Sequence, residues 1–186
     1  MLRHAVQIAS LQGLDGVTFG QVAAAASVSK GHLAQLFGDR EALQLATIEA
    51  VREIYAAHVA AGADAAPTAR ERLRRHCLGW FDYVEGRVLP GGCLITAANS
   101  EFRTIDGAVR DRLILLRKEQ RDFLRTLIVA ALAERASRRT IDAGDLVYQF
   151  LAYRAAANVS LFLDDTGGFA HAKRATASLL EVIDPA

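Results

Sequence analysis

The polar residues between positions 29 and 35, in the segment SKGHLAQ, carry the side chains best suited to hydrogen bonding with a nucleic acid. The amide of Gln35 can form paired hydrogen bonds to the edge of adenine, and Lys30 or His32 can reach base acceptors or phosphates. The first turn of a helix also presents free N–H groups that attract phosphate. The same residues suit the solvated surface of a small packing unit, so their spacing alone leaves both interpretations open.

Short helices would position this segment. Apolar residues at helical spacing predict one helix over residues 2–12 and a second over 19–26, which Thr18 can cap. Ser29 can cap a third helix that ends at Gly38. The tight ASVS turn between the second and third helices is typical of a helix-turn-helix. The side chains of the third helix expected to face inward are Leu33, Leu36 and Phe37.

The rest of the chain also predicts helices, because its short β-branched runs lack the alternation of strands. The segment GADAAPT, which follows a long fourth helix, is expected to be a linker. These further helices are expected over residues 39–61, 68–88, 94–102, 107–136, 142–163 and 169–183. The sequence therefore predicts an all-α fold of about nine helices. A three-helix helix-turn-helix domain at 1–45 would be linked through helix 39–61 to a larger helical domain at 46–186.

The composition gives more information about the cellular compartment of the protein than about the molecules that it binds. The formal net charge of +1 and the pI near 7.9 give no indication of a nucleic-acid, membrane or acidic partner. The two cysteines, Cys77 and Cys93, form no CxxC pair and suit a reducing cytoplasm, although a thiol sensor stays open. The most apolar segment, 146–163, contains Arg154 near its centre and is therefore a poor membrane span.

Catalytic and metal chemistry are not indicated. The sequence has no nucleophile–base pair and no phosphate-binding loop. Its histidines are scattered without an i, i+4 pair or a carboxylate partner, so no metal site is expected. These histidines are His4, His32, His58, His76 and His171. We therefore expect neither an enzyme nor a cofactor.

Two sets of motifs extend this interpretation. Residues 13–51 read GLDGVTFGQVAAAASVSKGHLAQLFGDREALQLATIEAV, and PGGC, TAANSEF and GAVRDRL follow between residues 90 and 113. In the types and spacing of these residues the chain resembles the TetR/AcrR family of transcriptional regulators. The resemblance implies an all-helical regulator with a DNA-binding domain in front. It also implies a larger domain that binds a small effector and pairs with a second copy of the chain.

The resemblance further implies which residues touch an operator. Thr18 and Arg40 stand where family members contact phosphate, and such contacts position a protein without reading the sequence. The third helix would offer its first residues to the major groove. The DNA-binding residues implied are Thr18, Ser29, Lys30, Gly31, His32, Gln35 and Arg40.

Several features depart from the family pattern. Ala34 stands where the recognition helix usually has an aromatic residue, and Ser27 replaces the usual turn glycine. Met1 lies inside the first predicted helix, so the basic arm that family members tend to carry is absent or the start of the sequence is misplaced. Residues 1–40 contain three cationic and two acidic side chains, a net charge of +1. Few cationic contacts predict weak non-specific binding with a shallow salt dependence. Specific affinity would then depend on pairing two half-sites through a dimer.

Residues 142–163 are apolar around most of the predicted helix, whereas a surface helix needs a single apolar stripe. Such a helix is either central in the monomer core or shared between that core and a subunit interface, and the resemblance favours the second. With the last helix it would form a four-helix seam across a two-fold axis. The expected homodimer interface comprises Phe150, Arg154, Asn158, Leu161, Phe162, Ala172, Ala175 and Leu179.

An effector pocket in a helical bundle is an apolar cavity with a few polar groups, although aromatic residues at helical spacing also serve any core. The candidate wall residues are Trp80, Tyr83, Cys93, Asn99, Phe102, Phe123 and Tyr153. Because these candidates contain no charged cluster, we expect a neutral or aromatic small-molecule effector.

Two hypotheses of function follow. The first is a cytoplasmic, ligand-responsive regulator that binds a double-stranded DNA operator as a homodimer and acts as a repressor released by its effector. The second is a small-molecule-binding protein that keeps the regulator fold but has weak or lost operator binding. Ala34 and the low local charge favour the second.

Overall fold

The computed structural model describes residues 1–102, 106–134 and 141–183, without the side chains of Asn99 and Ser100. Its elements are α1 (Leu2–Gln12), α2 (Phe19–Ala26), α3 (Lys30–Phe37), α4 (Arg40–Tyr55), a π-helical turn (Ala56–Ala60), α5 (Ala61–Asp64), α6 (Ala69–Glu85), α7 (Leu94–Glu101), α8 (Ala108–Ala133), α9 (Ala143–Phe162) and α10 (Thr166–Ile183). With α4, the π turn and α5 counted as one continuous segment, the described residues form nine helices and no strand. The predicted all-α fold is confirmed.

Helix boundaries differ from the predictions at two places. The GADAAPT segment is not a linker throughout, because α5 extends to Asp64 and only residues 65–68 form a turn. Helix α10 begins at Thr166 instead of residue 169, because the Asp165 carboxylate accepts a hydrogen bond from Gly168 N at 2.8 Å and caps it. Residues 135 and 136 of the predicted helix 107–136 lie outside the described residues. None of the helices described is both long and apolar enough to cross a membrane.

The chain divides into two compact units. Unit 1 comprises residues 1–54 and 87–116, and unit 2 comprises 55–86 and 117–186. Unit 1 thus holds the predicted helix-turn-helix domain together with α7 and the beginning of α8. The predicted boundary at residue 45 divides a DNA-binding domain from an effector-binding and dimerisation domain. This functional division stays a prediction.

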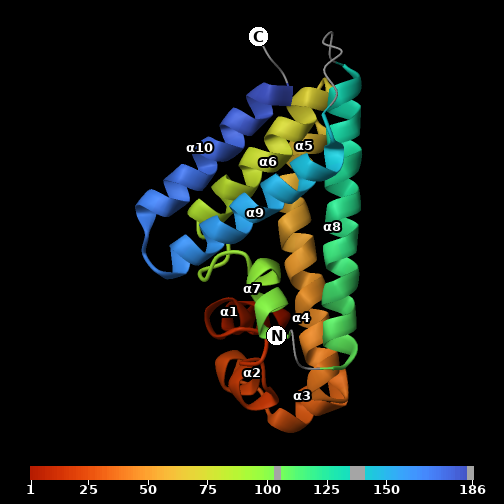
Figure 1. Cartoon of the computed structure of the whole chain (residues 1–186). Coiled ribbons are helices and arrows are strands. Elements are labelled where there is room, and N and C mark those ends of the chain that lie inside the picture. The colour runs from red at the N-terminus through yellow and green to blue at the C-terminus, as the bar shows by residue number, and fades with distance from the viewer. Residues whose placement is uncertain (103–105, 135–140, 184–186) are drawn as a thin grey trace. The chain divides into compact units, whose positions relative to one another are not determined.

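The first helices of unit 1 surround a small apolar core. Figure 1 shows α1, α2 and α3 gathered into one group, with α1 packing on α2 and α2 on α3. The fully buried side chains of this core include Ala5, Ala9, Leu14, Val17, Val22, Leu33, Leu43 and Ile48. Leu36 is not among them, contrary to the prediction, and is 52% exposed. Leu36 and Phe37 flank Leu33 on opposite sides of α3, and only the side that carries Phe37 is partly covered.

Segment 87–102 returns to α1 and the turn that follows it. The Gly91 N–H donates to the Ser10 hydroxyl over 2.7 Å in a buried hydrogen bond. The Glu101 carboxylate accepts hydrogen bonds from the backbone N–H groups of Leu14, at 3.0 Å, and Asp15. These backbone N–H groups lie in the turn after α1 and have no partner within a helix, so the Glu101 carboxylate satisfies them. Helix α7 thereby fixes the end of α1.

The beginning of α8 is tied to α4 in a similar way. The Glu41 carboxylate accepts a hydrogen bond from the Ala108 N–H at 2.7 Å, which satisfies one free donor at the start of α8. One turn further along α8, Arg112 Nε lies 2.7 Å from Glu49 Oε1, and this guanidinium lowers the pKa of the Glu49 carboxyl. The turn and helices from 87 to 116 therefore belong to the same unit as the first four helices.

Unit 2 is built around α6, α9, α10 and the later part of α8. Helices α9 and α10 form a hairpin along which they pack on each other, as Figure 1 shows in blue. Asp142 caps α9 by accepting from Gly144 N and Asp145 N. The core cluster of this unit comprises Leu73, Cys77, Leu124, Leu127, Ile128, Ala131, Leu146, Val147, Phe150, Leu180 and Ile183.

The packing of Gly91 gives a sharp test of unit 1. A Cβ atom at Gly91 would lie 1.7 Å from the Ser10 carbonyl oxygen, so backbone must move to admit it. We expect Gly91→Ala to lower the free energy of unfolding by about 3 kcal/mol, measured by urea denaturation. The control is Gly62→Ala in α5, where no atom lies within 4 Å of the added Cβ. It should stabilise the protein by about 0.5 kcal/mol. Equal effects of the two variants would contradict the packing described.

Candidate functional site

The segment α2–turn–α3 forms a helix-turn-helix whose last helix faces solvent. The Ser29 hydroxyl caps α3 by accepting a hydrogen bond from His32 N at 3.1 Å. Leu33 is fully buried and anchors the helix, and Phe37 is half-buried. The other six residues of α3 are exposed: Lys30, Gly31, His32, Ala34, Gln35 and Leu36. All four predicted contact residues within α3 therefore lie on its solvent side.

The turn before α3 is strained at Ser27. This residue adopts the left-handed conformation, with φ 55° and ψ 42°, and its N–H bonds back to the end of α2. In this conformation a residue with a Cβ atom is less stable than glycine by about 1 kcal/mol. The sequence thus keeps the helix-turn-helix geometry without the glycine that suits it best.

The side chain of Lys30 passes over α2 at Gly20, which has no side chain. A Cβ atom on Gly20 would lie 3.2 Å from Lys30 Cε, so the bare backbone of Gly20 accommodates the lysine stem. The Lys30 ammonium group has no ion-pair partner among the described residues. It is therefore available to an anionic partner at the first turn of α3.

Arg40 is already engaged. Its Nε donates to the Val17 carbonyl oxygen at 3.1 Å, and its Nη2 lies 2.7 Å from Asp15 Oδ1. The predicted phosphate contact at this residue would have to share the guanidinium with Asp15. Thr18, the other predicted phosphate contact, is half-buried and caps α2 by accepting from Gln21 N at 3.2 Å.

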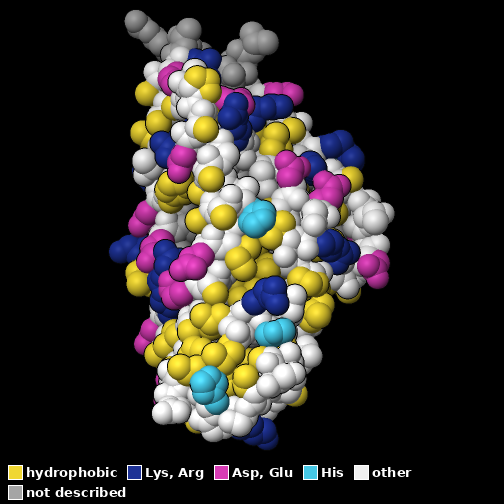
Figure 2. All heavy atoms as spheres, turned by 180° about the vertical axis from the view of Figure 1, so that it is seen from behind, with side chains coloured by type: hydrophobic (Ala, Val, Ile, Leu, Met, Phe, Trp, Pro, Cys, Tyr) yellow, Lys and Arg dark blue, Asp and Glu magenta, His cyan; other side chains and the backbone are white. Residues whose placement is uncertain are grey.

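The surface charge agrees with the near-neutral composition. On the face in Figure 2, Lys and Arg side chains do not gather into one continuous stripe, and acidic side chains lie among them. Because the charge of Arg40 is offset by Asp15, Lys30 supplies most of the uncompensated positive charge near the start of α3. The non-specific, salt-dependent part of any DNA binding should therefore be small.

A second candidate site is the aromatic interior of unit 2. The ring of His76 lies 6.2 Å from that of Tyr55 and 5.2 Å from that of Phe123, and the Tyr55 ring lies 5.9 Å from Tyr83. Arg154 of α9 lies with its Cζ 5.6 Å from the centroid of the Trp80 ring. Its Nη2 donates to the His76 carbonyl oxygen at 3.1 Å. The interior is therefore both aromatic and cationic.

The predicted pocket residues divide between the two units. Trp80, Tyr83 and Phe123 belong to the aromatic interior of unit 2, and the half-buried Tyr153 lies on α9 of the same unit. Cys93 and Phe102, both buried, lie in unit 1. The side chain of Asn99 lies outside the described part of the chain.

The sequence did not indicate Tyr55, His76 or Arg154 as pocket residues. His76 carried a usable signal, because it stands four residues before Trp80 and so shares its face of the helix.

The interior keeps two titratable groups uncharged. Burial, with the nearby Arg154 and Arg72 charges, lowers the pKa of His76 to about 3. Burial raises the pKa of the Cys77 thiol to about 11, against a weaker opposing effect of Arg154. Cys77 and Cys93 are both buried and form no disulfide. Cys77 therefore lacks the exposed, low-pKa character of a redox-sensing cysteine.

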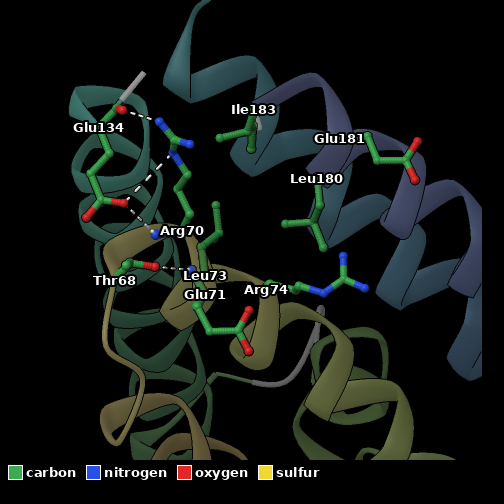
Figure 3. A pocket seen from close by; sticks show the side chains of 9 residues that line it. All are labelled: Thr68, Arg70, Glu71, Leu73, Arg74, Glu134, Leu180, Glu181 and Ile183. Carbon is green, nitrogen blue, oxygen red and sulfur yellow. Dashed lines mark hydrogen bonds and ion pairs between the residues drawn. The ribbon is translucent and has the colours of Figure 1, made fainter. Parts of the chain in front are cut away.

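Two cavities of unit 2 lie apart from the predicted pocket residues. One, of ≈ 250 Å³, opens among the start of α6, the end of α8 and the end of α10 (Figure 3). There Glu134 accepts hydrogen bonds from Ala69 N and Arg70 N, so its carboxylate caps α6. The other, of ≈ 560 Å³, is a groove between α8 and α9 with Arg117, Arg121 and Arg125 on one side and Tyr148 and Leu151 on the other. None of the seven predicted residues lines either cavity.

The predicted interface residues occupy two environments. Phe150, Arg154, Asn158 and Ala172 are at most 6% exposed within a single chain, because α9 and α10 bury them against unit 2 itself. They leave little surface for a partner. Phe162 is 49% exposed. The remaining three, Leu161, Ala175 and Leu179, are half-buried.

His76 should make stability depend on pH. Between pH 6.5 and about 3 the unfolded chain binds a proton at this residue and the folded chain does not. The free energy of unfolding should therefore fall as the pH drops below 6.5, by up to about 1.4 kcal/mol per pH unit from this group. Urea denaturation at several pH values measures the slope. His76→Phe should flatten the slope, and His171→Phe, at an exposed position, should retain it. An unchanged slope in the first variant would contradict the assignment.

Comparisons with known proteins agree with this geometry. The family model "Bacterial regulatory proteins, tetR family" matches residues 1–47, and "Tetracyclin repressor-like, C-terminal domain" matches residues 69–176. A search of curated protein sequences found no match.

Several solved structures share the fold. A TetR transcriptional regulator from Chloroflexus aurantiacus has a TM-score of 0.84 and 23% identity, over 95% of this chain and 90% of that one. A CifR cysteine mutant complexed with 26-bp operator DNA has a TM-score of 0.78 and 20% identity, over 95% and 93% of the two chains. AibR in complex with isovaleryl coenzyme A and operator DNA has a TM-score of 0.71 and 18% identity, over 99% and 96%.

The amino-terminal match covers the helix-turn-helix, and the second covers more than half of the chain, including α6, α7, α8, α9 and most of α10. The chain belongs to the TetR family of DNA-binding transcriptional regulators.

Proposed function

We propose that this protein is a ligand-responsive repressor that binds operator DNA through α3 as a homodimer in the cytoplasm and is released by a small-molecule effector. One observation carries the proposal. The first turn of α3 is fixed from behind by Leu33 and capped by Ser29, while Lys30, His32 and Gln35 all face solvent. A helix held this way can enter a major groove and offer donors to base edges. This is binding chemistry and requires no catalytic group.

Two of the similar structures support the same activity. The CifR mutant was solved with operator DNA, and AibR with both operator DNA and isovaleryl coenzyme A. Those ligands belong to those proteins. For this chain they support the proposal that the fold can bind both an operator and a small molecule.

An exposed apolar stripe on α9 supports the homodimer. Tyr148, Val159 and Phe162 are 75%, 56% and 49% exposed. With the exposed Ala152 and Ala155 they recur at intervals of four, three, four and three residues. This heptad spacing is that of a helix-packing seam. The proposed interface therefore uses this stripe and the predicted Phe162, and the buried Phe150 and Arg154 support it from within the chain.

The effector response is proposed to travel along helices shared by the units. Segment α4–π turn–α5 and helix α8 each begin in unit 1 and end in unit 2. In unit 1 they are joined by Glu41 to Ala108 and by Glu49 to Arg112. An effector that favours one arrangement of unit 2 would thereby change the geometry of the recognition helices and lower operator affinity.

One finding favours the second candidate function, a small-molecule-binding protein with weak or lost operator binding. Arg40 is paired with Asp15, and Ala34 is a small exposed side chain where an aromatic residue is usual in the family. Both reduce the contacts available to a DNA backbone.

Gel-shift titration with DNA from upstream of the protein's own gene distinguishes the two functions. We expect a sequence-specific complex with the wild type and about a tenfold loss of affinity for Gln35→Ala, because a paired amide–base contact is worth about 1–3 kcal/mol. Gln7→Ala, at an exposed glutamine of α1, is the matched control and should bind as the wild type does. A wild type that forms no specific complex would contradict the repressor and leave the second function.

Asp15→Asn tests the role of Arg40. The variant removes the negative charge beside the guanidinium and leaves its hydrogen bond to the Val17 carbonyl oxygen in place. Operator affinity should therefore rise, and the slope of log K against log[salt] should steepen by about 1. Asp106→Asn makes the same charge change in unit 1, at an exposed carboxylate paired with Arg110 at 3.3 Å. If both variants change the slope equally, the effect is one of overall charge and does not involve Arg40.

A further inference from the structure

Arg154 is a buried cation without a counter-ion in the part of the chain that the structure describes. Its residue is 3% exposed, and no carboxylate forms an ion pair with it among the described residues. The guanidinium has one hydrogen bond, from Nη2 to the His76 carbonyl oxygen, and one face toward the Trp80 ring. Its Nη1 is buried with no hydrogen-bond partner. Burying an unpaired charge is costly, so proteins normally pair such a group.

Two neighbouring ring nitrogens also have no hydrogen-bond partner among the described residues. Trp80 Nε1 and His76 Nδ1 are both buried, the Trp80 ring lies under the Arg154 guanidinium, and the His76 carbonyl oxygen accepts its one hydrogen bond. An arginine or tryptophan N–H can only donate, whereas Nδ1 of a neutral histidine donates or accepts according to its tautomer. The unsatisfied Arg154 Nη1 and Trp80 Nε1 donors beside one positive charge therefore call for a ligand that carries acceptors and a negative charge. A carboxylate has both, and its two oxygens match the planar guanidinium.

The surroundings match an organic carboxylate with an apolar body. The centroids of the Tyr55 and Phe123 rings lie 6.2 and 5.2 Å from that of the His76 ring. The Tyr83 ring lies 5.9 Å from the Tyr55 ring. Phe123 is 40% exposed, so the group reaches solvent at α8. Two acidic residues of α6, Asp82 and Glu85, both bind Lys173. No carboxylate among the described residues lies within ion-pair distance of Arg154.

We propose that the effector is an organic monocarboxylate, held by the Arg154 guanidinium and the Trp80 N–H, with its apolar body against the rings of Tyr55, Tyr83 and Phe123. The inference rests on the proposed function and names its ligand class. It differs from the sequence-based expectation of a neutral or aromatic effector by adding a negative charge, because the Arg154 guanidinium lies over the Trp80 ring and bonds to the His76 carbonyl oxygen.

Trp80 is the only tryptophan of the chain and therefore reports on the site directly. We would titrate the full-length protein, without DNA, with benzoate and hexanoate, and in parallel with benzamide and hexanamide, and record tryptophan fluorescence. The two carboxylates should produce a saturable change at concentrations at least tenfold below those of the matching neutral amides. No saturable change with either carboxylate, or equal affinity for the amides, would overturn the proposal.

The variants separate a ligand site from a structural arginine. Arg154→Met should abolish the carboxylate response and raise the thermal midpoint of the ligand-free protein, because an unpaired buried charge has been replaced by an apolar chain. Arg154→Lys keeps the charge without the planar fork and should bind benzoate at least tenfold more weakly than the wild type. A thermal midpoint that falls in Arg154→Met, as after a core truncation, would assign Arg154 to structure and overturn the proposal.

A second variant covers the case in which Arg154→Met does not fold. Trp80→Phe keeps an aromatic ring and removes the N–H, and thermal shift replaces fluorescence as the readout. The midpoint rise produced by benzoate should be smaller than in the wild type, whereas the same rise in both proteins would overturn the role of the Trp80 N–H.

Operator binding is measured separately, so the two proposals can fail separately. Carboxylate binding at Trp80 that leaves the operator complex unchanged would retain this inference and overturn the effector-released repressor. If neutral compounds release the operator complex equally from the wild type and the Arg154 variants, the effector-released repressor is retained and the carboxylate inference is overturned.

Discussion

The close approach of Gly91 to Ser10 holds together the part of the protein that carries the recognition helix. Helices α1, α2 and α3 have 11, 8 and 8 residues. Isolated helices of this length are marginal in water, so they need packing from outside their own segment. Residues 87–116 supply it, because Gly91 bonds to Ser10, Glu101 to the turn after α1, and Glu41 to the start of α8. The helix-turn-helix is thereby joined to the helices that continue into unit 2.

This arrangement gives the proposed effector response a physical route. A helix transmits displacement along its axis because every turn is hydrogen-bonded to the next. Segment α4–π turn–α5 is regular except at Ala56–Ala60, which lies in unit 2 just after the boundary between the units at Ile54 and Tyr55. Such π-helical turns are rare and occur frequently at functional sites. Here the π turn places His58 against Tyr83, so the irregular turn meets the aromatic interior of unit 2.

Much of the fold could be predicted because helix boundaries depend on neighbouring residues. Thr18 and Ser29 were expected to cap the second and third helices, and each accepts the expected backbone hydrogen bond. Leu36 was wrong because helical spacing does not say which side of a two-turn helix meets the core. The division of the pocket candidates could not be predicted either, since Cys93 and Phe102 lie at the two ends of helix α7, which belongs to unit 1.

The sequence by itself determined the helices, their caps and the family, because these depend on local spacing and on motifs read in order along the chain. Only the tertiary structure decided which polar groups are free and which are engaged. Arg40 is paired with Asp15, 25 residues away, and Arg154 meets His76, 78 residues away, without any carboxylate. Ion pairs and buried charges depend on side chains brought together from distant segments by packing. A charge therefore reveals its role only when its neighbours in space are known.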